Sequence, residues 1–191
     1  MLALKINPHL TECGTDEAGR GCLAGPVTAA AVILPDGFSH PWLTDSKQLS
    51  EKKRLALQKI IKTQAVAYTH AHVPVHEIEK LNILYAAIRA MHRSIKKLEP
   101  RPQFIAVDGN RFKTHPSIPH QCVVKGDSKY LHIAAASIIA KTERDALMVQ
   151  LHKKFPQYHW DKNKGYPTKA HRRAIAEYGP TPYHRKGFKL L

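Results

Sequence analysis

The chain is poor in acidic residues and in cysteine, and it has no long apolar run. Its 191 residues include 15 Asp and Glu against 30 Lys and Arg, which gives a formal net charge of +15. Such a surplus argues against a cationic partner and favours a polyanion, of which nucleic acid is the commonest. Because no segment has the length or the pattern of a membrane span or a signal peptide, we expect no membrane segment and a cytoplasmic location.

Cysteine and histidine also lack the spacings that metal sites and disulfides need. Cys13, Cys22 and Cys122 are odd in number and share no metal-ligand spacing, so we expect reduced thiols rather than a disulfide framework. The 13 histidines include no HExxH-type pair, and we predict no zinc site.

Positive charge is concentrated at the C-terminal end of the chain. Residues 151–191 hold ten Lys and Arg against two Asp and Glu. Aromatic residues are interleaved with these charges, namely Tyr158, Trp160, Tyr166, Tyr178 and Tyr183. Such aromatics can stack on bases or sugars, or they can form the core of a small subdomain, and we favour the core for most of them.

Strand-like and helix-like patterns alternate along the chain. We expect a hairpin over 11–34, strands at 65–73, 104–107 and 121–124, and helices at 51–62, 76–98, 127–153 and 168–178. This order predicts an α/β fold with a mixed sheet flanked by helices and a small C-terminal helical appendage. We expect one catalytic domain over 1–191, with 151–191 as a basic C-terminal extension that binds substrate.

Although acids are scarce, four of them fall where strands end or helices begin. Asp16 and Glu17 are adjacent at the end of the first strand, Asp108 ends a buried strand, and Asp127 opens the longest helix. Acids at strand ends can converge at one edge of a sheet. In a basic chain, adjacent carboxylates oppose the attraction of phosphates unless a cation lies between them, and Mg²⁺ prefers oxygen ligands. The pattern predicts a metal-dependent enzyme that cuts nucleic acid.

The role of Asp127 has an alternative. An acid at the start of a helix can be an N-cap, which the sequence does not separate from a metal ligand. Asp145 lies five turns along the same predicted helix, about 27 Å away at 1.5 Å per residue. An ion pair with Lys141, four residues before it, accounts for Asp145. We therefore favour Asp127 for the site.

The segment Gly19-Arg20-Gly21 follows the paired acids. A dinucleotide-binding turn would need a helix at these glycines, and a strand follows instead. Backbone N–H groups in a glycine turn, with an arginine beside them, suit a phosphate or a sugar hydroxyl. Because Glu17 would point away from Asp16 in a regular strand, we expect the glycines to bend the chain there.

Five ordered blocks of sequence resemble those of bacterial ribonuclease HII, over about residues 10–187. The blocks are DEAGRG with GPV within 16–27, DSKQLS at 45–50, VDG at 107–109, KGDS with IAAASIIAK within 125–141, and NKGYPT at 163–168. The resemblance implies an RNase H-like fold and an endoribonuclease that hydrolyses the RNA strand of RNA–DNA hybrids. It also implies incision at single ribonucleotides in duplex DNA, as in ribonucleotide excision during replication and repair. We expect a monomer that leaves 5′-phosphate and 3′-hydroxyl ends.

The family pattern also implies which residues form the site. Asp16, Glu17, Asp108 and Asp127 would hold Mg²⁺ or Mn²⁺, with two ions present during catalysis. The residues implied for substrate binding are Gly19, Arg20 and Gly21 at the ribose 2′-hydroxyl, Tyr166 at the sugar of the RNA–DNA junction, and Lys47, His184 and Arg185 at backbone phosphates. The chain departs from the pattern at Gly187, where the family usually has Ser.

Two other functions remain compatible with these residues. A DNA junction resolvase of the same fold would share the acids but would need no reader of the 2′-hydroxyl. A non-catalytic basic binding protein would use the acids only as helix caps and ion-pair partners. Metal-dependent cleavage of a duplex that contains one ribonucleotide distinguishes both from a ribonuclease.

Overall fold

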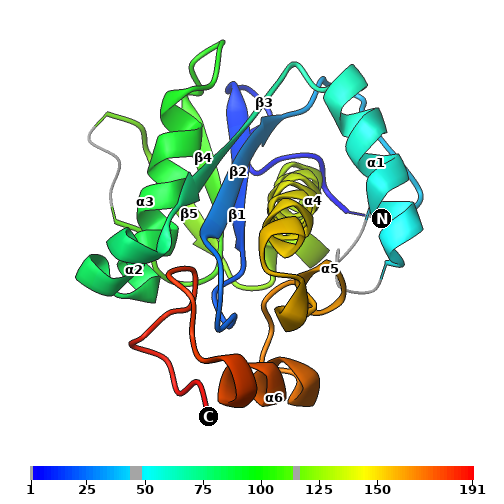
Figure 1. Ribbon diagram of the computed structural model, residues 1–191. Helices are drawn as coiled ribbons and strands as arrows, with labels where there is room; N and C mark the ends of the chain where they lie inside the picture. The colour runs from blue at the N-terminus through cyan, green and yellow to red at the C-terminus, as the bar shows by residue number, and fades with distance from the viewer. Residues whose placement is uncertain (1, 44–48, 114–116) are drawn as a thin grey trace.

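Five strands form one mixed sheet in the computed structural model, which describes residues 2–43, 49–113 and 117–191 (Figure 1). The strands are β1 (Glu12–Ala18), β2 (Val27–Ile33), β3 (Ala67–Val73), β4 (Phe104–Asp108) and β5 (His120–Val123), in the order β3-β2-β1-β4-β5. β1 is central, since it pairs antiparallel with β2 and parallel with β4. The expected hairpin and the three other expected strands are confirmed.

Helices cover both faces of the sheet. They are α1 (Glu51–Gln64), α2 (Val75–Leu81), α3 (Ile83–Lys96), α4 (Leu131–Lys154), α5 (Trp160–Asn163) and α6 (Lys169–Tyr178), with short 3₁₀ turns η2 (Gly126–Ser128) and η3 (Pro156–Tyr158) on either side of α4. Ser50 is the N-cap of α1, because its hydroxyl accepts a hydrogen bond from the Lys53 N–H. Across the described ranges, no helix combines the length and apolar composition that a membrane span requires.

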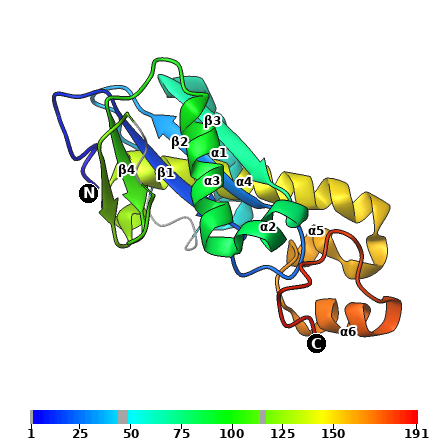
Figure 2. The same ribbon diagram turned by 90° about the vertical axis from the view of Figure 1, so that its left-hand side faces the viewer.

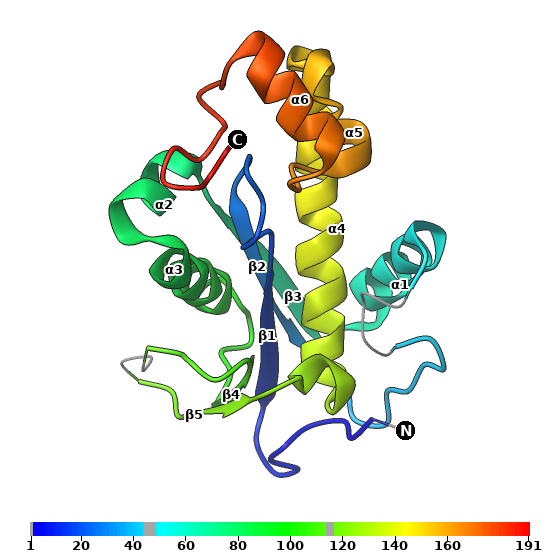
Figure 3. The ribbon, with the colours of Figure 1, turned by 90° about the horizontal axis from the view of Figure 1, so that it is seen from below.

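The two faces of the sheet carry different halves of the core. Because side chains alternate along a strand, Cys13 and Val107 pack on the side of α3, whereas Ala30 and Val32 pack on the side of α4 and α1. Figure 3 shows this arrangement, with α3 on one side of the strands and α4 and α1 on the other. The sheet is thus the middle layer of three.

The helix α4 packs directly on β1 because Gly14 has no side chain. A Cβ atom at Gly14 would lie 2.2 Å from the carbonyl carbon of His132, at the start of α4. The backbone of the helix therefore approaches the backbone of the strand, and the alanines at 134–136 are fully buried beside it. This close packing fixes α4 over the strand that carries Asp16 and Glu17.

The chain beyond α4 packs against the loop that follows β1. Tyr158 and Trp160 stack with ring centroids 5.2 Å apart and are buried together with Leu23 of that loop. The tail also pairs with the loop, since the Gly25 N–H donates to the Tyr183 carbonyl over 2.8 Å. Figure 2 shows α5, α6 and the C-terminus gathered at one end of the molecule. Most of the tail aromatics are core residues, as expected.

Two predicted helices differ from those in the structure: one is broken and the other begins later. The prediction of one helix over 76–98 is wrong, because Asn82 has φ 64° and ends α2. Its side chain then caps α3 by accepting from the Leu84 and Tyr85 N–H groups. The helix expected over 127–153 begins later, at Leu131, since η2 and the extended residue Tyr130 precede it.

The contact between β1 and α4 predicts that Gly14→Ala destabilises the protein. The added methyl group would overlap the backbone at His132, and overpacking of this kind costs about 1–3 kcal/mol or more. Thermal unfolding should show a midpoint lower by roughly 2–4 °C for each kcal/mol lost. The control is Gly187→Ala, where an added Cβ meets no atom within 4 Å. A Gly14→Ala protein as stable as Gly187→Ala would contradict this packing.

Candidate active site

Asp16 and Asp108 lie at the same level of two parallel strands. The register of β1 with β4 pairs Thr15 with Val107, and the two acids are the next residues of their strands. Side chains at equal positions of neighbouring strands share a face, and here that face is covered by α4. Ser137 of α4 hydrogen-bonds the Asp16 carboxylate. The two acids therefore meet at the carboxyl ends of the strands, as the sequence predicts.

Glu17 stays in the strand and points to the opposite face. It pairs with Ala29 of β2, whose side chain belongs to the core beneath α3. The expected bend of the chain at the glycines is therefore not what brings Glu17 to the site. Because β1 ends one residue later, Glu17 and Asp108 line both the hollow on the α3 side and the hollow on the α4 side. Glu17 reaches the site around the end of the sheet.

The hollow on the α4 side unites most of the residues that the sequence singles out. It is lined by Asp16, Glu17, Asp108, Gly19, Arg20, Gly21 and Tyr166, and also by Ala18, Arg54, Ser137 and Lys141. Sequence reasoning did not select Arg54, Ser137 or Lys141 for the site. A signal existed for two of them, since Ser137 and Lys141 are four residues apart and so lie on one face of α4.

Burial and mutual repulsion raise the pKa values of two of these acids. The pKa of Asp16 lies well above its ordinary range, chiefly because the carboxyl is buried and also because Glu17 and Asp108 are close by. Burial likewise raises the pKa of Glu17, although its ion pair with Arg20, at 3.0 Å, opposes the shift. The folded protein thus resists the ionisation of Asp16 and Glu17.

Asp127 lies beside this group rather than in the lining of the hollow. It is buried within η2, and the N–H of the preceding residue, Gly126, donates to Asp108 Oδ1 over 2.7 Å. The alternative role as N-cap is not what the structure shows, since Tyr130 occupies the N-cap position of α4. Asp127 is therefore attached to the acidic group through its neighbour.

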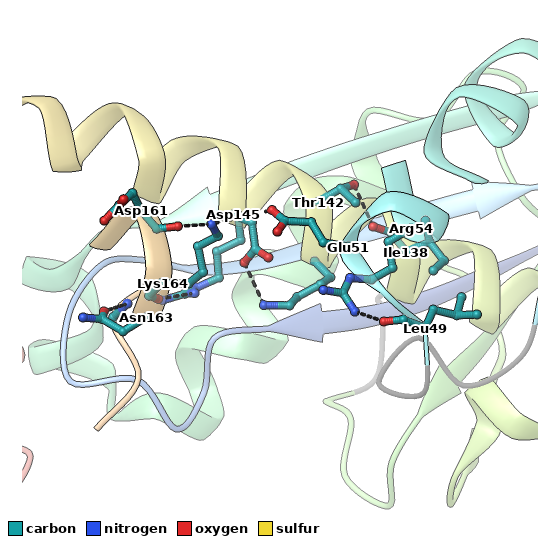
Figure 4. Close-up of polar contacts among 12 residues, drawn as sticks. Leu49, Glu51, Arg54, Ile138, Thr142, Asp145, Asp161, Asn163 and Lys164 are labelled. Atoms are coloured by element: carbon teal, nitrogen blue, oxygen red, sulfur yellow. Dashed lines mark hydrogen bonds and ion pairs between the residues drawn. The ribbon is translucent and has the colours of Figure 1, made fainter. Parts of the chain in front are cut away.

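Two basic side chains also line the hollow, Lys141 of α4 and Arg54 of α1. Figure 4 shows Arg54 beside Leu49, and Asp145 on α4. Lys141 donates to Asp145 over 2.8 Å, which confirms the expected ion pair, although Asp145 is largely buried. Arg54 donates to the Leu49 carbonyl. Positive charge at these positions faces the acids across the hollow, where a phosphate backbone would need it.

Tyr166 is partly exposed and has cationic groups against its ring. Its side chain is 38% exposed, and Lys141 Nζ lies 5.3 Å and Arg144 Cζ 5.9 Å from the ring centroid. Such contacts hold an aromatic ring in place while leaving part of it open to a ligand.

The remaining predicted substrate contacts differ in where they lie. Gly19, Arg20 and Gly21 form the edge of the hollow directly after β1. His184 and Arg185 are not on the surface, with 1% and 0% of their area exposed. The Arg185 guanidinium donates to backbone carbonyls rather than pointing outward, so the structure does not bring it to a phosphate. Lys47 lies outside the described residues.

The donor chemistry of the acids fits a hard divalent cation. All four side chains offer carboxylate oxygens, which are ligands that Mg²⁺ and Mn²⁺ prefer. The pKa values of Asp16 and Glu17 are raised chiefly by burial and further by neighbouring carboxylates. Over residues 2–43, 49–113 and 117–191, no three His, Cys, Asp or Glu side chains are already gathered tightly enough to hold an ion. The ion pair of Glu17 with Arg20 is one contact that would have to open.

Solved structures of ribonucleases H share this fold. The ribonuclease H2 of Pyrococcus horikoshii matches with a TM-score of 0.79 at 24% identity, over 94% of each chain. The RNase HII of Archaeoglobus fulgidus, solved as a complex with PCNA, matches with a TM-score of 0.77 at 26% identity, over 95% of this chain and 96% of that one. The fold is therefore RNase H-like, as expected, and its class is that of the type 2 ribonucleases H.

Sequence comparison then gives the family. The model of the ribonuclease HII family matches residues 13–191. The ribonuclease HII of Bacteroides fragilis is 59% identical over 191 residues, covering 100% of this chain and 95% of that protein. That of Porphyromonas gingivalis is 53% identical over 189 residues, covering 99% and 94%. The chain belongs to the ribonuclease HII family, and it is a metal-dependent endoribonuclease that acts on RNA–DNA hybrids.

Repulsion among the acids predicts that Asp16→Asn stabilises the metal-free protein at neutral pH. An amide in place of the carboxylate removes a buried charge and can still accept a hydrogen bond from the Glu17 N–H, which Asp16 Oδ1 accepts over 2.6 Å. Because folding raises this pKa, the destabilisation by the carboxyl is complete above the raised pKa, declines as the pH falls below it, and vanishes only below the ordinary pKa of Asp. The gain in unfolding temperature should therefore shrink as the pH falls through the raised pKa of Asp16.

Unfolding midpoints of both proteins, measured in EDTA from pH 8 downward, check this prediction. Titrating groups that do not interact with Asp16 cancel in the difference between the two proteins, which leaves Asp16 and the neighbours it interacts with, Glu17 and Asp108. The control is Asp36→Asn, which removes an exposed carboxylate paired with Lys5 and should not stabilise the protein. A loss of stability in Asp16→Asn, or a difference that does not vary with pH, would contradict the electrostatic account.

Proposed function

We propose that this enzyme incises duplex DNA at single embedded ribonucleotides as well as cleaving RNA–DNA hybrids. Hydrolysis would leave 5′-phosphate and 3′-hydroxyl ends. The observation that carries the proposal is the composition of one hollow. The acids Asp16, Glu17 and Asp108, the turn Gly19–Gly21 and the ring of Tyr166 all line it. A group that cuts a phosphodiester and a group that inspects the adjacent sugar would thus share one site.

Selectivity for RNA requires a contact with the 2′-hydroxyl, because that group distinguishes RNA from DNA at a single position. We propose that backbone N–H groups of Gly19–Gly21 make this contact. Gly19 has φ +92°, a conformation that side chains rarely adopt, and it keeps the backbone close to the acids. Tyr166, on the opposite edge, would pack on the sugar that follows.

We propose that Asp16, Glu17, Asp108 and Asp127 hold Mg²⁺ or Mn²⁺. When bound, two such ions supply an activated water and neutralise the charge on the leaving 3′-oxygen. The chain orients its own donors beforehand: the Glu17 N–H fixes Asp16 Oδ1, and the Gly126 N–H fixes Asp108 Oδ1. A solved relative, Bst-RNase HIII, carries Mn²⁺; at 18% identity it shares the fold with a TM-score of 0.68, over 95% of this chain and 68% of its own.

The basic tail would serve as the substrate-binding extension. It carries Tyr166 and packs on the loop that follows β1, so it lies beside the proposed ribose site. Lys47 would add a phosphate contact. We also propose that the enzyme is monomeric and cytoplasmic, and that it acts in ribonucleotide excision during replication and repair.

The decisive substrate is a DNA duplex that contains one ribonucleotide. With Mg²⁺ or Mn²⁺ the enzyme should cut it next to the ribonucleotide and leave the matching all-DNA duplex intact. Asp108→Asn should lower the rate by at least 10³-fold, because it removes a charged ligand for the metal. The amide oxygen can still accept the hydrogen bond from the Gly126 N–H. The end groups are checked by ligation, which needs a 5′-phosphate and a 3′-hydroxyl. Equal cleavage of both duplexes, or cleavage of the hybrid alone, would overturn the proposal.

Tyr166→Ala should slow incision at single ribonucleotides more than cleavage of a continuous RNA–DNA hybrid. We expect kcat/KM on the single-ribonucleotide duplex to fall on the order of tenfold, which is about 1.4 kcal/mol of lost binding. Tyr178→Ala is the matched control, since Tyr178 is an exposed tyrosine of the same subdomain and does not line the hollow. Equal losses on the two substrates would count against a role at the junction.

A further inference from the structure

Two buried arginines are directed at the backbone of the loops around the active site. Arg144 of α4 and Arg185 of the tail are both 0% exposed. Burying a charge is costly unless hydrogen bonds replace its hydration, and burial lowers the pKa of Arg185 to about 10. Each guanidinium donates to three backbone carbonyls. A charge retained at such cost calls for a role beyond filling space.

Arg185 holds the carbonyls of the turn that follows the acids. It donates to Gly19 O over 2.8 Å, to Arg20 O over 2.9 Å, and to Gly25 O over 2.9 and 3.0 Å. In a trans peptide the C=O and the next N–H point in opposite directions. Since the carbonyls of Gly19 and Arg20 point to the guanidinium, the N–H groups of Arg20 and Gly21 point away from it. Arg20 and Gly21 line the hollow, and Arg185 does not.

The positive charge also changes these peptide groups chemically. A cation bonded to the carbonyl oxygen polarises the amide and strengthens its N–H as a donor. Arg185 thus orients the amides of Arg20 and Gly21 and makes their N–H groups stronger hydrogen-bond donors. A sugar oxygen is a suitable acceptor for such groups.

Arg144 joins this loop to the segment that carries Tyr166. It donates to Pro26 O over 3.0 Å and to Ala24 O over 3.1 Å, and also to Lys164 O over 2.8 Å. The guanidinium lies so near the turn that a Cβ atom on Gly19 would be 2.0 Å from Arg144 Nε. One side chain therefore sets the spacing between the two sides of the proposed ribose site.

We propose that Arg144 and Arg185 are positioning residues for ribose discrimination, which rests on the proposed function. They fix the Arg20 and Gly21 amides at the distance from Tyr166 that a ribose requires. Lysine carries the same charge but cannot span these carbonyls, because its three donors share one nitrogen. Backbone contacts such as Leu23 N–H to Gly165 O, at 2.8 Å, still join the segments when a guanidinium is removed.

The test compares binding with and without the single 2′-hydroxyl. Arg185→Lys and Arg144→Lys are titrated, in Ca²⁺ to suppress cleavage, with the one-ribonucleotide duplex and with the all-DNA duplex of the same sequence. We expect Kd for the ribonucleotide duplex to rise about tenfold and Kd for the all-DNA duplex to change less than twofold. The control is Arg101→Lys, at an exposed arginine that precedes β4 and so lies at the end of that strand opposite Asp108, and it should change neither value.

Three results would separate the possible failures. A proportional rise in both Kd values would indicate general phosphate binding or loosening of the tail, and would overturn the positioning role. Unchanged discrimination in folded variants would do the same. If the wild-type enzyme itself shows no preference for the ribonucleotide duplex, then the proposed function fails before the arginines are considered.

A second measurement needs no substitution and so does not depend on the variants folding. In ¹⁵N-labelled wild-type enzyme, the amide signals of Arg20 and Gly21 should shift on adding the ribonucleotide duplex and shift much less with the all-DNA duplex. Equal shifts with both duplexes would show that these amides do not read the ribose, and the proposal would be wrong.

Discussion

Repulsion among buried carboxylates is the constraint around which the site is organised. Asp16, Glu17 and Asp108 meet at the carboxyl ends of neighbouring strands in a chain whose formal net charge is +15. The fold stabilises this arrangement with backbone and side-chain donors, from the Glu17 and Gly126 N–H groups and from Ser137. Those contacts orient the acids without neutralising them. A divalent cation would neutralise the carboxylates and would also bind a phosphate of the substrate.

Close packing of the surrounding elements offsets the unfavourable burial of these acids. α4 approaches β1 at Gly14 with no intervening side chain, so the strand that bears two acids packs closely on the helix that bears Ser137. The tail closes the other end, because its aromatic core packs on the loop after β1. The proposed metal-binding acids and the proposed ribose-reading turn are therefore positioned by the same packing contacts. The packing of α4 on β1 and of the tail on the loop after β1 stabilises the fold against the cost of burying the acids.

Much of the fold and the acidic group could be predicted from the sequence. Apolar runs and the Ser50 cap locate the strands and α1, because these signals are local. Asn82 was missed as a break, since helical periodicity continues through it while its backbone does not. The face on which Glu17 lies follows from pairing with β2, which a single strand does not reveal.

The basic residues were harder to place than the acids. In the sequence, Arg185 and Arg144 look like surface cations. Only the folded loops show that their guanidinium groups donate to buried backbone carbonyls. The assignment of Asp127 to the acidic site stays a prediction, and its place in a 3₁₀ turn is not evident from the sequence. Local chemistry is thus visible in the sequence, whereas the assignment of a charge to the surface or the interior depends on long-range packing.

Proton release on cation binding tests the central claim most directly. Mn²⁺ is titrated into the enzyme by calorimetry near pH 5.5, about one unit above the ordinary pKa of Asp and Glu, in two buffers of different ionisation enthalpy. Because folding raises the pKa values of Asp16 and Glu17, the carboxyl groups still hold protons that a bound ion must displace. The account predicts proton release near pH 5.5 that decreases as the pH rises through the raised pKa values of Asp16 and Glu17. Binding of Mn²⁺ near pH 5.5 without proton release would contradict it.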